Sequence, residues 1–204
     1  MSGGPPDDTA SAEFAVLVLL VPCEGRERIL LTKRPDTLDR YAGHVSFPGG
    51  AREAGDADLA ATAIRETEEE VGIPGALVRI EGELGWFETA LGHRVKPYLG
   101  RLLEPVEPRP DAREVERIIW LEASALAPEL FRERGRFIDA AGRERITYAF
   151  ELDGCEVWGL TARILREVTL DRRLLAVLRP SPGDIEAGSP GERSPPSAKR
   201  GPSP

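Results

Sequence analysis

The sequence predicts a single layered α/β domain. Short apolar runs of strand length alternate with turn signals along most of the chain, and two longer segments repeat apolar residues at helical spacing. Pro, Ser and Gly are concentrated towards the two ends, which leaves a body from about residue 13 to residue 178. Strands combined with two substantial helices are typical of layered α/β or α+β domains, and no internal repeat suggests another architecture.

The body opens with two strands. Residues 14–21 are apolar along their whole length, residues 28–32 contain the apolar run Ile29-Leu30-Leu31, and Glu24-Gly25 between the two segments is a turn signal. Continuous apolar strands are buried on both faces, so we expect this part of the sheet to be covered on both sides. A loop follows and ends in Phe47-Pro48-Gly49-Gly50.

A helix is predicted over residues 58–71, with Gly72 as its C-terminal stop. The apolar positions that we expect to face inward are Ala60, Ile64, Thr67 and Val71.

Further strands are predicted at 77–87, 94–103 and 115–121, with a Pro-rich loop at 104–110. A hairpin around Ala140-Ala141-Gly142 leads to a last helix over residues 160–178. Its expected inward residues are Leu160, Ile164, Leu165, Val168, Leu174 and Leu175.

The ends have a different composition. Residues 179–204 contain seven Pro, five Ser and four Gly, and residues 1–12 include Gly3-Gly4-Pro5-Pro6. Segments of this kind bury too little apolar surface to fold, so we expect both ends to be disordered. Two cysteines, Cys23 and Cys155, are too few for a disulfide framework and are expected to be reduced thiols.

Charge excludes several classes of protein. The 204 residues include 35 acidic and 27 basic side chains, a formal charge of −8 that argues against a nucleic-acid partner. The longest apolar run stops at Pro22, far short of the ~20 residues of a membrane-spanning helix. The N-terminus has no basic residue ahead of an apolar stretch, so we expect a cytoplasmic protein without a membrane partner.

The candidate chemistry lies in one carboxylate cluster. On the predicted helix Glu66, Glu69 and Glu70 stand at i, i+3 and i+4 and share one face. A glutamate run on a helix is usually a solvated surface. Here, however, Pro48-Gly49-Gly50 permits a close backbone approach and Arg65 can orient a glutamate by ion pairing. Clustered carboxylates repel one another, and all-oxygen ligands select Mg²⁺ or Mn²⁺.

The combined pattern, from Gly49-Gly50 to Arg65-Glu66-Thr67-Glu68-Glu69-Glu70-Val71-Gly72-Ile73, resembles the Nudix box. The resemblance implies an α/β/α sandwich around a mixed sheet and hydrolysis of a diphosphate linked to a nucleoside. It also implies a metal site formed by the Gly50 carbonyl, Glu66, Glu69 and Glu70. There are two departures: Asp56 stands where a Glu is expected, with one extra residue before Arg65, and Thr67 fills an apolar position. We give Asp56 no catalytic role.

Segments outside the box resemble the coenzyme A pyrophosphatase branch of this family. They include Leu30-Leu31-Thr32-Lys33-Arg34 before the box and Trp158-Gly159-Leu160-Thr161-Ala162-Arg163 near the end, within a likeness that spans most of residues 28–167. Pro35 and Asp39 depart from the signature of that branch, and Arg40 is one position away from its expected Arg. The resemblance implies that coenzyme A or its thioesters are the substrate.

Basic residues near the box are the predicted substrate contacts. They are Lys33, Arg34, Arg40 and His44. Arg34 can clamp a phosphate bidentately, although Lys33 and Arg34 can equally be a solvated pair at a strand end and His44 can equally be structural. Trp158 is expected to pack in the core.

The expected mechanism is metal-assisted hydrolysis in which Glu69 or Glu114 is the general base and Arg65 orients the carboxylates. Two alternatives stay open: hydrolysis of another nucleoside diphosphate derivative, such as ADP-ribose or a dinucleoside polyphosphate, and a non-catalytic binding module of the same fold. The sequence does not fix the oligomeric state, and a homodimer is left open.

Overall fold

A computed structural model of the chain describes residues 12–37, 41–89, 91–139 and 142–178. The two ends that we expect to be disordered, apart from residue 12, therefore lie outside the described residues, as does the candidate contact Arg40. No described helix has the length and apolar character needed to cross a membrane.

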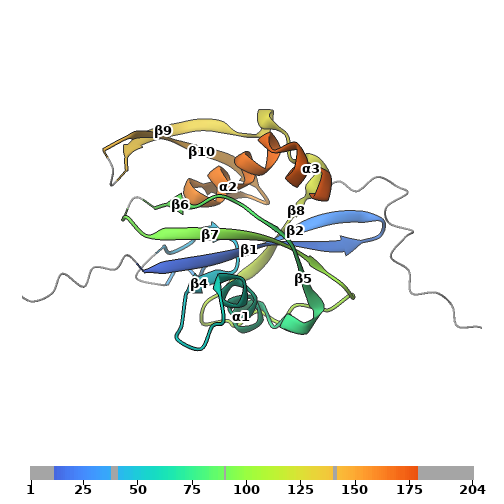
Figure 1. Ribbon diagram of the computed structural model, residues 1–204. Coiled ribbons are helices and arrows are strands. Elements are labelled where there is room, and N and C mark those ends of the chain that lie inside the picture. Colours follow the sequence, from blue (N-terminus) through green and yellow to red (C-terminus); the bar gives the residue numbers. More distant parts are fainter. Residues whose placement is uncertain (1–11, 38–40, 90, 140–141, 179–204) are drawn as a thin grey trace, which may run out of the picture.

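The central layer is a mixed sheet with strand order β3-β2-β1-β7-β5 (Figure 1). In addition, β4 pairs with β1, β6 with β7 and β8 with β2; β1 and β7 are parallel, and the other pairs are antiparallel. Its strands are β1 (Glu13–Cys23), β2 (Arg26–Lys33), β3 (Val45–Ser46), β4 (Gly49–Ala51), β5 (Val78–Glu83), β6 (Phe87–Glu88), β7 (Arg94–Leu102) and β8 (Arg117–Glu122).

The layers on the two faces of this sheet differ. Helix α1 (Leu59–Val71) covers one face. The other face is covered by α2 (Gly159–Leu170), together with the short α3 (Arg172–Leu178) and a second antiparallel sheet (Figure 1). The second sheet has the order β11-β10-β9, with β9 (Arg132–Ile138), β10 (Glu144–Leu152) and β11 (Cys155–Trp158). Short 3₁₀ turns at Gly75–Leu77, Ala123–Ala125 and Pro128–Leu130 complete the fold.

Strand β1 shows why the sheet is covered twice. Its alternate side chains belong to different cores: Leu17 and Leu19 pack with α1, whereas Val18 and Leu20 pack with α2. All four are fully buried. The apolar run therefore faces α1 on one side and α2 on the other, as the sequence predicted. The α/β/α sandwich around a mixed sheet is confirmed.

Several predicted elements differ in the structure. The strand over 77–87 is divided into β5 and β6, because the pairing register shifts near Gly82 and β5 ends at Glu83. The strand at 115–121 begins two residues later, at Arg117. The last helix is divided at Asp171, whose carboxylate accepts hydrogen bonds from the amides of Arg173 and Leu174 and so starts α3.

The two predicted hairpins are confirmed. Glu24 and Gly25 both have positive φ between β1 and β2. The hairpin of β9 and β10 closes at Asp139, whose carbonyl accepts a hydrogen bond from the Gly142 amide at 2.9 Å. The two cysteines are free and half-buried, in agreement with the sequence.

Candidate active site

Helix α1 presents the carboxylate cluster. It starts after Asp58, whose carboxylate accepts a hydrogen bond from the Ala61 amide at 2.8 Å, and it ends at Gly72 with φ 66°. Glu66, Glu69 and Glu70 share a face as predicted, but their exposure differs: the Glu69 side chain is 56% exposed, the Glu66 side chain 16%, and Glu70 is buried. One edge of this carboxylate face is therefore exposed to solvent, and the other edge is buried in the protein.

The buried side of α1 agrees only in part with the prediction. Of the four residues expected to face inward, Thr67 and Val71 are buried, whereas Ala60 and Ile64 are only half-buried. The other buried residues of the helix are Leu59, Thr62, Ala63 and Glu70. The apolar pattern counted Glu70 as a solvent-facing residue and so placed the inward stripe elsewhere. Glu70 is buried, and its carboxylate accepts a hydrogen bond from the Gly49 amide in the turn at Pro48-Gly49-Gly50, which we call the glycine turn.

Arg65 organises the exposed end of the cluster. Its guanidinium lies 3.0 Å from Glu66 and 2.9 Å from Glu69, and it donates a hydrogen bond to the Ala51 carbonyl at 3.0 Å. One cation thus joins two of the carboxylates to strand β4, so Arg65 pairs with glutamates as the sequence suggested.

Asp56 holds Arg65 in place, a role that the sequence prediction missed. Its side chain is 5% exposed and accepts hydrogen bonds from Arg65 Nε at 3.0 Å, the Thr62 hydroxyl at 2.8 Å and the Glu53 amide at 2.9 Å. The hydrogen bond from Arg65 is the largest of the effects that hold the pKa of Asp56 far below its ordinary range. The available signal was the acidic residue near the expected Glu position of the box.

The glycine turn approaches the carboxylates closely. A Cβ on Gly50 would stand 2.3 Å from Glu66 Oε1, and a Cβ on Gly49 would stand 2.3 Å from the Ala15 carbonyl oxygen. The Gly49 amide donates a hydrogen bond to Glu70 Oε1 at 3.3 Å. Only glycine permits this packing of β4 between β1 and α1.

Glu70 is the most perturbed carboxylate of the cluster. Burial raises its pKa to about 7, with Glu114 and Glu66 adding in the same direction, while the Gly49 amide and Arg34 oppose the shift. Burial also raises the pKa of Glu66, against the effect of Arg65. A nearby positive charge would favour the ionised form of both groups.

Glu114 reaches the same cluster from a different segment. The amides of Arg109 and Asp111 donate hydrogen bonds to the carbonyls of Val71 and Glu70 at 2.7 and 2.9 Å, which ties this loop to the end of α1. Glu114 lies in the turn that follows, ahead of β8, and its charge raises the pKa of both Glu66 and Glu70. Two separate segments therefore supply carboxylates to one place.

The donors present suit a hard divalent cation. Glu66, Glu69, Glu70 and Glu114 offer only oxygen, as does the Gly50 carbonyl. Within the described residues, no three acidic, His or Cys side chains are arranged as a metal-ligand set. Here Arg65 holds Glu66 and Glu69, and the Gly49 amide holds Glu70. The predicted ligand set stays a prediction.

The predicted basic contacts have different surroundings. Lys33 is paired with Glu116 at 2.7 Å and with Asp36 at 3.3 Å, so its charge is already matched. Arg34 Nε is buried, and in the described part of the chain it has no hydrogen-bond partner. His44 is half-buried between the Tyr41 ring and the Trp158 ring, at centroid distances of 5.4 and 4.6 Å. The Arg34 amide donates a hydrogen bond to the His44 carbonyl at 2.9 Å, so these two predicted contacts are neighbours. The expectation that Trp158 packs in the core is wrong, because its side chain is half-buried and contacts His44 and Arg134 instead.

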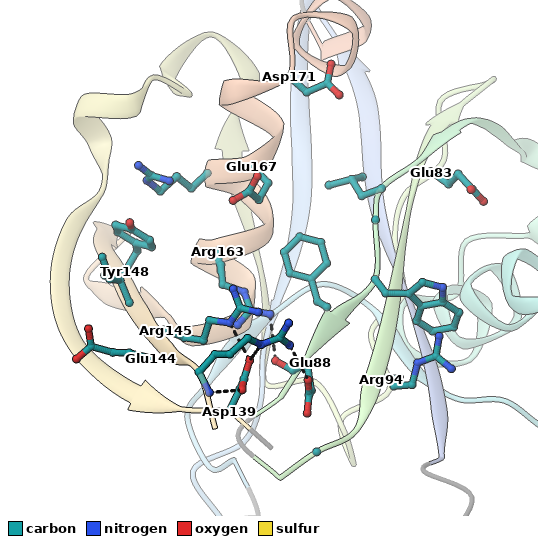
Figure 2. Close-up of a pocket in the computed structure, with 18 of the residues that line it drawn as sticks. Glu83, Glu88, Arg94, Asp139, Glu144, Arg145, Tyr148, Arg163, Glu167 and Asp171 are labelled. Carbon is teal, nitrogen blue, oxygen red and sulfur yellow. Dashed lines mark hydrogen bonds and ion pairs between the residues drawn. The ribbon is translucent and has the colours of Figure 1, made fainter. Parts of the chain in front are cut away.

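A cleft of about 910 Å³ lies elsewhere, between β6 and the layer of β10 and α2 (Figure 2). Asp139, Arg145 and Arg163 gather at one end of it, and Glu167 and Asp171 lie towards the other (Figure 2). Arg143 pairs with Asp139 at 3.0 Å. Acidic and basic side chains are mixed in this cleft, and none of the predicted site residues lines it.

Known proteins are similar to this chain in sequence and in fold. The NUDIX domain model matches residues 13–141. Nudix hydrolase NudL of Yersinia enterocolitica is 31% identical over 164 residues, which are 80% of this chain and 84% of the relative. NudL of Photorhabdus laumondii is 32% identical over 156 residues, or 76% and 82% of the two chains. A solved MutT/nudix family protein from Enterococcus faecalis shares the fold, with a TM-score of 0.54, 14% identity and coverage of 87% of this chain and 71% of that chain.

Proposed function

The chain belongs to the Nudix family of hydrolases, which cleave phosphoric anhydride bonds, and we propose that its substrate is coenzyme A or a coenzyme A thioester. Hydrolysis of the diphosphate would yield 3′,5′-ADP and 4′-phosphopantetheine or its acyl derivative. The observation that carries the proposal is the cluster of Glu66, Glu70 and Glu114 beside Arg34, whose buried Nε is unpartnered among the described residues. The resemblance outside the box supports the choice of coenzyme A.

Each charged group has a proposed task. Nudix hydrolases need divalent metal ions, and the Gly50 carbonyl, Glu66, Glu69 and Glu70 would hold Mg²⁺ or Mn²⁺. A bound divalent ion would neutralise the diphosphate and lower the pKa of the attacking water. Arg34 would clamp one phosphate through its guanidinium. Lys33 would have to exchange its pairing with Glu116 for a substrate phosphate, and His44 would line the site.

The proton of the attacking water needs an acceptor. Glu69 and Glu114 are both exposed carboxylates at the cluster, so each is a candidate general base. Arg65, anchored by Asp56, would keep Glu69 in position. Replacement of each glutamate by Gln removes the acceptor with little change of shape. Because Glu69 is also a proposed metal ligand, the base is the residue whose loss abolishes turnover while Mg²⁺ binding is retained.

The test is a substrate panel. Purified protein with Mg²⁺ or Mn²⁺ is incubated with coenzyme A, acyl-coenzyme A, ADP-ribose and a dinucleoside polyphosphate, and products are separated by chromatography. Release of 3′,5′-ADP from coenzyme A is expected. Rapid turnover of ADP-ribose with none of either coenzyme A species would reject the proposal.

A pair of variants on one helix separates catalysis from folding. Glu69→Gln should abolish turnover with an unchanged circular dichroism spectrum. Glu68→Gln is the matched control, because Glu68 is exposed on the same helix and contacts the Gly75 amide at 3.0 Å, away from the cluster. Full activity of the Glu69 variant would exclude Glu69 from the chemistry.

A further inference from the structure

Arg134 brings the second sheet into contact with the residues that lead into the glycine turn. It lies on β9, with its guanidinium carbon 4.2 Å from the centroid of the Trp158 ring. The same ring meets His44 at 4.6 Å, with the two planes at 62°. Strands β9 and β11 both pair with β10, at Ala149 opposite Arg132 and Trp158, which fixes their relation. Arg134 and His44, far apart in sequence, therefore share one aromatic wall.

The guanidinium of Arg134 is held in position, but only part of its hydrogen-bonding capacity is used. Glu156 accepts a hydrogen bond from Arg134 Nε at 2.9 Å, and the same carboxylate also pairs with Arg132. Among the described residues, the two terminal nitrogens of Arg134 make no hydrogen bond, and its side chain is 40% exposed. A stacked guanidinium keeps its outer edge for two parallel hydrogen bonds to a phosphate.

His44 links Arg134 to the glycine turn. Its ring contacts Trp158, on which Arg134 is stacked, and its carbonyl accepts a hydrogen bond from the Arg34 amide at 2.9 Å. After Val45 and Ser46, which follow His44, the chain enters Phe47-Pro48-Gly49-Gly50, where the Gly49 amide donates a hydrogen bond to Glu70. Arg134 and Arg34 both lower the pKa of His44, after the larger effect of burial.

We propose that Arg134 is a specificity-determining residue that binds a phosphate lying outside the cleaved diphosphate. The inference rests on the proposed function, in which Arg34 holds the diphosphate itself. Coenzyme A carries such a group, the 3′-phosphate of its ribose, one sugar away from the diphosphate. Trp158 and Glu156 are positioning residues, since the ring of Trp158 stacks on the guanidinium of Arg134 and the carboxylate of Glu156 accepts a hydrogen bond from its Nε.

The test compares two ligands that differ by that phosphate. Adenosine 3′,5′-bisphosphate and AMP are titrated calorimetrically, with Mg²⁺ present, into the wild type, Arg134→Gln and Arg134→Lys. Charge-assisted hydrogen bonds are the strong class, so Arg134→Gln should weaken binding of the bisphosphate about tenfold or more and leave AMP within about twofold. Arg134→Lys should recover part of the loss.

Arg136→Gln is the matched control. Arg136 is exposed on the same strand and pairs with Glu133 and Glu144 instead of Trp158. It should bind both ligands like the wild type. Equal weakening of both ligands in Arg134→Gln, or equal affinity of the wild type for both, would overturn the inference. Because binding is read without turnover, a protein that discriminates the two ligands but fails to cleave coenzyme A would refute the proposed function alone.

Discussion

Asp56 decides how Arg65 holds the carboxylates. It is nearly buried, and its two oxygens contact Arg65 at 3.0 and 3.2 Å. Asp56→Asn would remove the charge and free the guanidinium to move away from Glu66 and Glu69. We predict a fall in kcat of about tenfold to a hundredfold, since small displacements of catalytic groups have effects of this size. The thermal midpoint should also fall.

Glu53→Gln serves as the control for Asp56. Glu53 is 70% exposed and 4.0 Å from Arg65, so its charge contributes little. Steady-state kinetics on both variants tests the role of Asp56. A normal kcat in Asp56→Asn would mean that Arg65 keeps its position without this anchor.

Residue identity alone predicted only part of the site. The spacing of Glu66, Glu69 and Glu70 gave their common face, because helical geometry is local. Burial of Glu70 was missed, since a carboxylate is normally assigned to solvent and its cover comes from Gly49 in another strand. Arg134 was missed because its contact with Trp158 depends on how three strands pair, which no local pattern records.

At the level of elements, the end of α1 fixes the loop that carries Glu114. Gly72 has φ 66°, and a Cβ there would lie 3.0 Å from the Arg109 carbonyl oxygen. Gly72→Ala would strain the backbone by about 1–2 kcal/mol and push residues 109–111 away from the helix. We predict a loss of stability of that order in urea unfolding, together with a several-fold lower kcat through the displaced Glu114.

Gly55→Ala is the control for this element. A Cβ on Gly55 meets nothing within 4 Å, so stability and kcat should stay near those of the wild type. A Gly72 variant that loses stability but keeps full kcat would show that the position of the 109–114 loop does not affect catalysis.

A second prediction concerns the β9–β10 hairpin. The buried Asp139 accepts hydrogen bonds from the Arg143 amide and from the guanidiniums of Arg143 and Arg145. Its pKa is lowered to about 2, first by the hydrogen bond from the Arg143 amide. Because the folded value lies below the ordinary 3.8, this stabilisation is complete above about pH 4 and is lost as pH falls towards 2.

The measurement is the thermal midpoint between pH 5 and pH 2. Asp139→Asn should be less stable than the wild type at pH 5, and the difference should shrink as the pH falls. Glu129→Gln, an exposed substitution in the turn before β9 and away from Asp139, should follow the wild type throughout. A constant difference across this pH range would show that Asp139 acts through shape and not through charge.

Helices and strands, like the site residues, were predicted correctly where the signal is local in the sequence. Strands β1 and β2 and their turn were predicted because the apolar run and Glu24-Gly25 are local signals. The break at Asp171 was missed because the apolar period continues into α3 and only the capping hydrogen bonds interrupt it. Strand β11 has four residues and was too short to be recognised from its own sequence.

At the level of the whole molecule, net charge first argued only against a nucleic-acid partner. The formal charge is −8, yet a phosphate-containing substrate is proposed. The two agree if carboxylates on α1 and the 109–114 loop take up divalent cations, which convert a negative surface into a receptor for a diphosphate. The covered sheet matters here because both faces of β1 are buried, which holds α1 and the glycine turn in a fixed relation.

Because α1 and the glycine turn are held together only in the folded chain, we predict that a bound divalent cation stabilises the folded state. A ligand at ten times its Kd that binds only the folded state contributes about 1.4 kcal/mol, which for a domain of this size raises the thermal midpoint by about 3–6 °C. We expect Mg²⁺ to give this rise in the wild type and not in a Glu66→Gln/Glu70→Gln double variant, in which two carboxylates are neutral. NaCl of equal ionic strength controls for screening. An equal rise in the double variant would show that the cation binds away from α1. The positive charge proposed to bind the substrate would then also lie elsewhere.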